Sequence, residues 1–444
     1  MASWSLPSVQ FLAGNPDADA EIKQLGSVGL VIMMAMGFIG YKLFKTTLLP
    51  QRVKMLLMGC FLPLFIIGPF AVLSIRGPCK ALMAHFSLSF FGVMGFFKWL
   101  ELMCGTGPRG SDTSLGRFVL YFTSPAEVLF DEEGKLAKAP PGQMQELLLS
   151  FAGHTALATI ILSLGRETGF SPFLGCAVDP LSLPFFGLPR SLPAIYLQAM
   201  YVYCMLAQAL ITHRAPLALF GIATRTPMRQ PMWLSTSARD YWGRRWNLIV
   251  HHLMKRTFFT PFATRKEKAW RHVGGILAFV MSGLFHEYMW AAVNWPNTDQ
   301  YIPGLAVLFF LVQYAICAVE VVLERTTLGK WATTWPRPLK TVVTTAIVLP
   351  WGPLFLHGIN GMAIDCSEWG QTVKLSWDPS TEQRGSLTPP LDWVLMLIMA
   401  VFFVAHGRWQ KRRQRFSTMT SPACKVVPCA GGGAIPEATN VAGA

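Results

Sequence analysis

The sequence predicts an all-α polytopic membrane protein with about nine transmembrane helices and additional interfacial amphipathic helices. The first observation is composition: 52% of the 444 residues are hydrophobic and 14% are charged, whereas a soluble domain carries about 25% charged residues. The second is that the apolar residues lie in continuous runs, and roughly 20 such residues cross a bilayer as a helix. Backbone in hydrocarbon must form helices or closed barrels. The runs do not alternate as barrel strands do, so helices are favoured.

Nine runs are long and apolar enough to be candidate spans. In order they cover residues 26–45, 55–75, 81–103, 147–165, 192–213, 273–292, 303–323, 340–358 and 391–406. The third contains Lys98 and Glu101, and the fourth and ninth are short. Each of these three could instead be a re-entrant or tilted element.

The basic residues predict an orientation. If the N-terminus is lumenal and the spans alternate, 30 of the 38 Lys and Arg residues lie on the cytosolic side, against seven on the other side and Lys98 within a span. Such a bias follows the positive-inside rule and predicts a cytosolic C-terminus. The formal net charge of +14 is therefore mainly a topology signal. Apolar runs separate the basic residues and no nucleic-acid motif occurs, so a nucleic-acid partner is not expected.

The chain is expected to form one polytopic domain over residues 1–416, followed by a disordered, Gly-rich cytosolic tail over residues 417–444. The first apolar run lacks a preceding basic region, so a cleavable signal peptide is not expected. Cys176 and Cys366 both fall on predicted lumenal loops. Whether they form a disulfide is left open.

The connection 214–272 is unusually long and aromatic. Its segment Ser237-Ala-Arg-Asp240 has the pattern of a helix N-terminus with a capping box. Helical spacing then places Trp242 and Trp246 on an apolar face, and Arg244, Asn247 and His251 on a polar face. This amphipathic pattern predicts a helix in the membrane interface. It either anchors the loop, or lines the cytosolic mouth of a cavity and binds an anionic ligand.

The run 273–292 contains adjacent ionisable residues, His286 and Glu287. Ionisable groups inside a span are costly and indicate function. Ser282 lies one helical turn before His286 and shares its face. Glu287 points about 100° away and is expected to anchor a neighbouring span. A zinc site is not expected, because no second histidine follows at the required spacing. His286 is either a buried structural residue or a general base, the usual role of histidine near neutral pH.

Together these segments resemble a known family. Trp242-Gly-Arg-Arg-Trp246-Asn247, followed about forty residues later by Ser282-Gly-Leu-Phe-His286-Glu287, is similar to the signature of the membrane-bound O-acyltransferases. Residues 234–248 look closely like the plant and algal wax synthase branch. The resemblance is specific over about residues 192–292, and the rest of the chain matches in hydropathy, length and number of spans.

The resemblance implies a function and a site. The family transfers an acyl group from acyl-CoA to a hydroxyl, here of a long-chain fatty alcohol to form a wax ester, in a chamber enclosed by the membrane helices. It implies His286 and Asn247 as catalytic residues. The expected substrate-binding residues are Arg244, Arg245, Trp242, Trp246, His251, Ser282 and Glu287. Acyl-CoA is a co-substrate, and neither a metal nor another cofactor is expected.

Alternatives remain at this stage. A sterol or terpenoid could be the acceptor in place of a fatty alcohol. From a different class, a transporter could use the intramembrane groups His154, His286, Glu287 and Glu320 as an ion path, although no inverted repeat is evident. The expected location is the endoplasmic reticulum membrane.

Overall fold

The computed structural model describes residues 8–10, 16–76, 82–167, 191–295, 301–360 and 374–376. The chain divides into two units, Met1–Leu387 and Thr388–Ala444, and all described residues belong to the first. The predicted ninth span, the C-terminal tail and both Cys176 and Cys366 lie outside the described residues.

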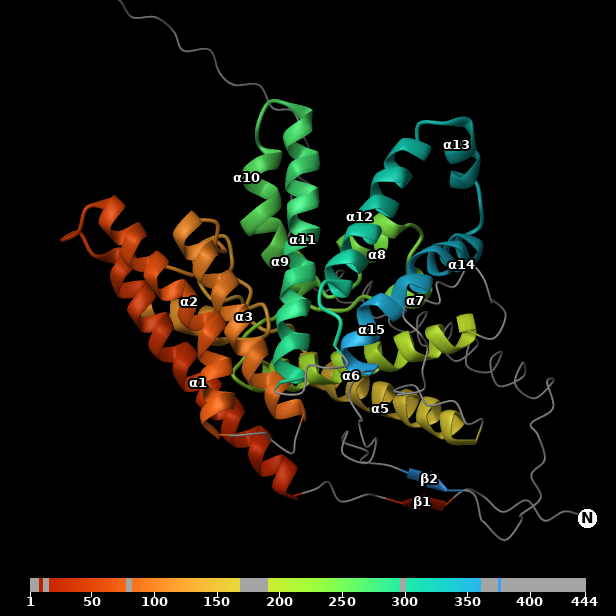
Figure 1. The fold of residues 1–444 in the computed structure, drawn as a ribbon, viewed down its shortest axis with the longest axis horizontal. Helices are drawn as coiled ribbons and strands as arrows, with labels where there is room; N and C mark the ends of the chain where they lie inside the picture. The colour runs from red at the N-terminus through yellow and green to blue at the C-terminus, as the bar shows by residue number, and fades with distance from the viewer. Residues whose placement is uncertain are drawn as a thin grey trace, which may run out of the picture. The chain divides into compact units, whose positions relative to one another are not determined.

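The described chain is almost entirely helical (Figure 1). The first half contains α1 (Pro16–Lys45), α2 (Gln51–Arg76), α3 (Leu82–Cys104), α4 (Leu115–Thr123), α5 (Gln143–Glu167) and α6 (Ser191–Leu219). Short helices follow: α7 (Pro231–Leu234), α8 (Ala238–Arg244), α9 (Leu248–Met254), the π-helical turn η1 (Lys255–Phe259) and α10 (Thr260–Ala263). The remainder is α11 (Lys268–Val293), α12 (Leu305–Leu323), α13 (Thr327–Thr333), α14 (Arg337–Val348), the 3₁₀ turn η2 (Leu349–Trp351) and α15 (Gly352–Asn360). Two three-residue strands, β1 (Ser8–Gln10) and β2 (Lys374–Ser376), pair antiparallel with Val9 opposite Leu375.

Seven described helical segments are long and apolar enough to cross a membrane. They cover residues 23–45, 51–75, 85–104, 195–219, 269–293, 305–323 and 337–356. Each overlaps a predicted span, so the predicted all-α polytopic membrane fold is confirmed. The predicted span 147–165 forms α5 but is not among the seven. The predicted run 147–165 itself carries no Asp, Glu, Lys or Arg, so the sequence still supports a span there.

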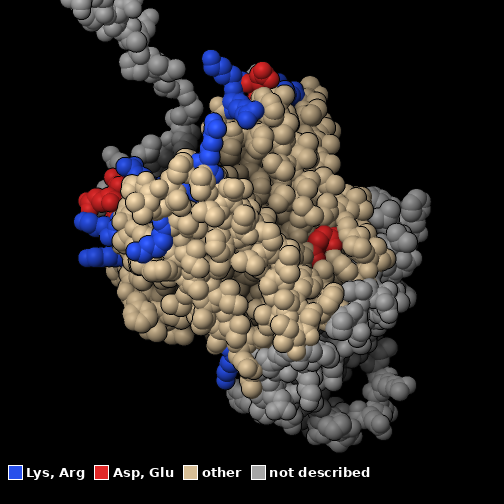
Figure 2. Space-filling view, turned by 60° about the vertical axis from the view of Figure 1, so that its left-hand side comes forward, with Lys and Arg blue, Asp and Glu red and all other residues tan. Residues whose placement is uncertain are grey.

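The long helices leave apolar side chains on the outside, as helices facing lipid do. Val31 is 63% exposed and Leu56 is 69% exposed. Figure 2 shows a broad face made almost entirely of uncharged residues, with Lys and Arg gathered mainly at its margins. This distribution is the one expected where a protein surface is in contact with lipid hydrocarbon.

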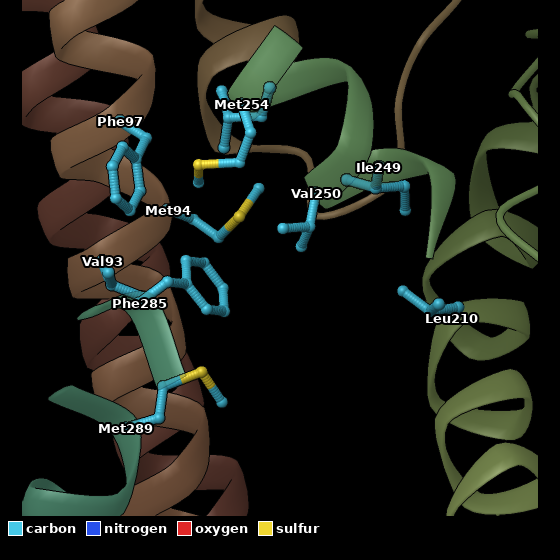
Figure 3. Close-up of a cluster of buried hydrophobic side chains, with 10 residues drawn as sticks. Val93, Met94, Phe97, Leu210, Ile249, Val250, Met254, Phe285 and Met289 are labelled. Atoms are coloured by element: carbon cyan, nitrogen blue, oxygen red, sulfur yellow. The ribbon is translucent and has the colours of Figure 1, made fainter. Parts of the chain in front are cut away.

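Helix α11 is central to the packing of the site. It packs against α3 on one side and against α12 on another, and α9, η1 and α10 also contact it. Figure 3 shows Val93, Met94 and Phe97 of α3 gathered with Phe285 and Met289 of α11, residues of α9 and Leu210 of α6 in one cluster. The cytosolic-loop prediction for residues 214–272 is therefore incomplete, because α9 packs between membrane helices.

Candidate active site

The segment after α7 does not form the single amphipathic helix that the sequence predicts. The predicted start is confirmed: Ser237 is the N-cap of α8, and its hydroxyl accepts a hydrogen bond from the Asp240 N–H at 3.1 Å. The helix then ends at Arg244, and a second helix, α9, begins at Leu248. The prediction of one continuous helix is wrong because aromatic packing competes with helical geometry here. Trp246 stacks on Tyr241, with ring centroids 5.5 Å apart.

Asn247 lies at this break in a left-handed conformation, with φ 36° and ψ 63°. Asparagine tolerates this region better than most residues with a side chain. Its Oδ1 accepts a hydrogen bond from the Val250 N–H at 3.4 Å and so caps α9. Among the described residues, no group bonds to its Nδ2. The amide N–H₂ is therefore available as a donor to a ligand.

His286 lies far along α11. Its Nδ1 is 2.7 Å from the Ser282 carbonyl oxygen. A carbonyl only accepts, so Nδ1 must carry the proton, and Nε2 of the neutral ring keeps its lone pair. Within the described parts of the chain, no hydrogen bond reaches Nε2. The ring thus has the tautomer that a general base requires. Ser282 contributes through its main chain, and its side chain is buried.

Aromatic rings surround the imidazole of His286. Phe310 of α12 stacks on it with centroids 4.9 Å apart and an interplanar angle of 23°. Phe355 of α15 meets it edge-on at 4.9 Å, and Phe285 lies at 5.1 Å. This apolar surround excludes water and suits a lipid substrate.

The two motif segments meet around Phe310. Trp242 of α8 lies 5.7 Å from the Phe310 ring, on which His286 also stacks. The Trp242 indole N–H donates to Gln313 Oε1 of α12 at 3.1 Å, and Gln313 Nε2 donates to the Val348 carbonyl at 3.0 Å. Behind Asn247, Ile249 and Val250 share a buried cluster with Phe285. The fold thus places the α8–α9 break and the middle of α11 in one neighbourhood.

Glu287 is engaged by the protein. Its Oε1 accepts the N–H groups of Ala306 at 2.7 Å and Val307 at 3.2 Å, and its Oε2 accepts the Tyr301 hydroxyl. The N-cap position of α12 is Gly304, which has no side chain to cap the helix. The Glu287 carboxylate supplies that cap, and its charge is favourable beside a helix N-terminus. This is the anchoring geometry expected from the sequence.

The basic residues of the motif differ in their surroundings. Arg244 is exposed. The Arg245 guanidinium pairs with Asp240 at 2.6 Å and donates to the Arg229 carbonyl at 3.2 Å. Burial and the charges of Arg225 and Arg245 lower the pKa of Arg229. This cationic surface suits an anionic ligand better than a neutral one.

His251 of α9 is partly buried beside His252, with ring centroids 5.3 Å apart. Burial, together with the charges of His252 and Lys255, lowers the pKa of His251 to about 4. Its imidazole is therefore neutral at physiological pH.

A second set of ionisable residues was not predicted as a cluster from the sequence, which identified Lys98 and Glu101 only as charges within the third span. Lys98 and Glu101 of α3, Glu127 after α4, and Arg256 of η1 are joined in one buried network. Charges inside a predicted span were a signal that could have identified the first two. Nothing in the sequence paired them with Arg256, which is 155 positions from Glu101.

This arrangement defines a class of protein. It is a multispanning membrane protein with a histidine that lies among apolar side chains and whose tautomer leaves Nε2 able to accept a proton. Residues 225–312 match the sequence model described as the membrane bound O-acyl transferase family. The resemblance inferred from the motifs, to this family and its wax synthase branch, is confirmed.

Individual relatives support the same class. The chain is 24% identical to acyl-CoA–sterol O-acyltransferase 1 of Arabidopsis thaliana over 331 residues, which are 72% of this chain and 85% of that protein. It is 28% identical to the long-chain-alcohol O-fatty-acyltransferase of Simmondsia chinensis over 41% of this chain and 54% of the relative. It is 30% identical to the probable long-chain-alcohol O-fatty-acyltransferase 9 of Arabidopsis thaliana over 30% of this chain and 40% of the relative. The matches to these two alcohol acyltransferases span about half their length. The comparisons support O-acyl transfer as the class of activity.

Proposed function

We propose that the protein transfers the acyl group of a long-chain acyl-CoA to the hydroxyl of a long-chain fatty alcohol, forming a wax ester and free CoA. The observation that carries this proposal is the state of His286: Nδ1 is bonded to a carbonyl, Nε2 is unengaged among the described residues, and Phe310 and Phe355 pack against the ring. A base with this tautomer in an apolar surround fits deprotonation of a lipid alcohol.

The reaction proceeds in one displacement. Nε2 of His286 takes the proton of the alcohol as its oxygen attacks the thioester carbonyl carbon. The new C–O bond forms, the C–S bond breaks, and the thiolate of CoA leaves and recovers a proton from the imidazolium. Nδ2 of Asn247 is the donor that orients the thioester or stabilises the developing oxyanion. No metal or further cofactor takes part, and acyl-CoA is consumed as a substrate.

The depth of His286 is consistent with a long acyl donor. It lies 17 residues after Ala269, where the candidate span begins, which corresponds to roughly 25 Å along a helix. The charged part of CoA stays with the basic residues near Arg229 and Arg244, and an extended arm carries the thioester inward. The packing of α9 against Phe285 gives the cytosolic segment a path to this depth.

The acceptor is tested directly. The protein is expressed in a host that lacks neutral lipid synthesis, the cells are fed a fatty alcohol or a sterol, and the new ester is identified. We expect wax esters. Sterol esters alone would instead establish the sterol acceptor, which is favoured by one observation: the match to the sterol acyltransferase covers 85% of that relative. The comparisons match acyltransferases, so an ion-transport function is not proposed.

We also propose that the protein resides in the endoplasmic reticulum with a cytosolic C-terminus, as the charge bias predicts. A tag at the C-terminus should be digested by protease added outside sealed microsomes. Protection of the tag would contradict this orientation.

A further inference from the structure

A buried ion network joins three separate parts of the chain. Lys98 and Glu101 of α3 are 6% and 0% exposed. The Lys98 ammonium donates to the carbonyl oxygens of Tyr121 at 2.7 Å and Ser124 at 2.6 Å, at the C-terminal end of α4. Glu101 accepts the hydroxyl of Tyr121. These bonds fix α4 and the residues after it to α3.

Arg256 connects this part to the candidate active site. Its Nε lies 2.6 Å from Glu101 Oε1, and its Nη1 lies 2.9 Å from Glu127 Oε1. One guanidinium thus bridges two buried carboxylates from different elements through two directional N–H groups of its planar fork. Met94, Lys98, Glu127, Ile249 and Leu253 also border the small cavity beside it.

Two more side chains pair with Glu127. His252 Nδ1 and Arg225 Nε each lie 2.8 Å from its Oε2. Burial alone would raise the pKa of Glu127, but the hydrogen bond from His252 and the charges of His252, Arg256 and Arg225 lower it to about 2. Glu127 is therefore ionised, and both carboxylate oxygens are occupied.

The four-residue spacing of His252 and Arg256 explains how one segment presents both partners. Residues 252 and 256 are four apart along α9 and η1, so they lie on the same side of the helix. The turn Lys255–Phe259 is a π-helix, a geometry that occurs often at functional sites. Arg256 lies nine residues, about two and a half helical turns, beyond Asn247, which caps the first turn of the same segment. Displacing Arg256 would therefore move the helix that Asn247 begins.

Stability alone is a weak account of this network. Buried ion pairs are often no more stabilising than well-packed apolar residues, because each charge loses its hydration. Such pairs can instead fix one geometry among several. Here the geometry that they fix is the placement of α9 against α3, and α9 also packs on Phe285, next to His286.

We propose that Arg256 is a positioning residue for acyl transfer. It holds α9 through Glu101 and Glu127, and so places the amide of Asn247 relative to His286. This inference rests on the proposed function, because its kinetic consequence requires the acyl-transfer reaction. Its structural consequence does not, and the two can be measured separately.

The test uses the full-length protein purified in detergent and compares Arg256→Gln with Arg265→Gln. Arg265 is a matched control: it is exposed, lies in the same connection, and its guanidinium lies over the rings of Phe262 and Trp270. Two measurements are made on monodisperse protein. Hydrogen exchange reports the peptide containing residues 248–254, and steady-state kinetics report kcat and both KM values.

We expect Arg256→Gln to accelerate exchange over residues 248–254 and to lower kcat on the order of 10- to 100-fold, since small misplacements have effects of this size. Both KM values should stay within about 2-fold of wild type, and Arg265→Gln should match wild type. In an Asn247→Ala background, Arg256→Gln should lower kcat little further. The amide that Arg256 is proposed to position is already absent there, so the two effects are not additive. If Arg256→Gln does not fold, Glu127→Gln is measured in the same way with the same expectations.

An unchanged kcat, unchanged exchange or a full additional loss in the Asn247→Ala background would overturn the proposal. If wild-type protein forms no ester from any acceptor offered, the proposed function fails, and the exchange measurement still decides whether Arg256 holds α9.

Discussion

Replacement of His286 is the most direct test of the site. His286→Ala removes the base and also removes a ring that packs against Phe285, Phe310 and Phe355. Each aromatic contact contributes about 0.5–1.5 kcal/mol beyond area burial, so this variant changes stability as well as chemistry. His286→Phe separates the two effects, because it retains an aromatic ring and lacks both nitrogens.

A general base contributes roughly 100- to 10,000-fold in rate, which is about 3–5 kcal/mol of transition-state free energy. We expect both variants to lose at least this factor in ester formation per unit of monodisperse protein. His286→Phe should retain more thermal stability than His286→Ala. Release of CoA is followed with a thiol reagent, and the ester is identified by mass spectrometry.

His272→Ala is the control. His272 lies on the same helix but is exposed, and its ring contacts Tyr314. Its replacement should leave ester formation within about 2-fold of wild type. Well-folded His286→Phe with more than a tenth of wild-type activity would refute the assignment of His286 as the base. Loss of activity that merely follows loss of folded protein would show a structural residue.

Three further substitutions test neighbouring groups. Asn247→Gly keeps the left-handed conformation, whereas Asn247→Ala strains it by about 1–2 kcal/mol. We expect similar losses of kcat in both variants and lower thermal stability in Asn247→Ala. Full activity in either variant would exclude a role for the amide. Arg244→Ala should raise the KM for acyl-CoA without changing the KM for the alcohol. Arg245→Ala should do the same and should also lower stability, because it leaves Asp240 without its ion-pair partner. Equal KM values for acyl-CoA in wild type and Arg244→Ala would indicate that Arg244 does not bind CoA. Glu287→Ala leaves two N–H groups of α12 uncapped and should cost about 1–3 kcal/mol in thermal unfolding, so unchanged stability would contradict its role as the cap of α12.

The fold class was predictable because hydrocarbon imposes a strong rule on sequence. Any crossing helix needs about 20 apolar residues, and seven predicted runs coincide with such helices. Helix α5 follows the same rule: residues 147–164 carry no Asp, Glu, Lys or Arg, and His154 within this run hydrogen-bonds the buried Tyr203 of α6.

The site was predictable only as far as chemical identity and local spacing extend. Two features depend only on residues within one or two helical turns: the N-cap at Ser237, and the different directions in which the neighbouring side chains of His286 and Glu287 point. The break before Asn247 was not, because it depends on Trp246 stacking on Tyr241 and Trp242 bonding to Gln313 of a distant helix. Helical periodicity cannot register such competition, since each residue there also fits a continuous helix.

The charged network was also not predictable from local sequence, because its members are distant along the chain. When the span is considered alone, Lys98 and Glu101 are two charged residues in an apolar run, and they lower its mean hydropathy. Their partners lie on segments that follow much later, and only the fold brings Arg256 and Glu127 to the same face of α3. A charge that weakens a span is thus informative about tertiary contacts: its cost in hydrocarbon requires a partner. In this protein, that requirement ties a membrane helix to the segment that carries Asn247.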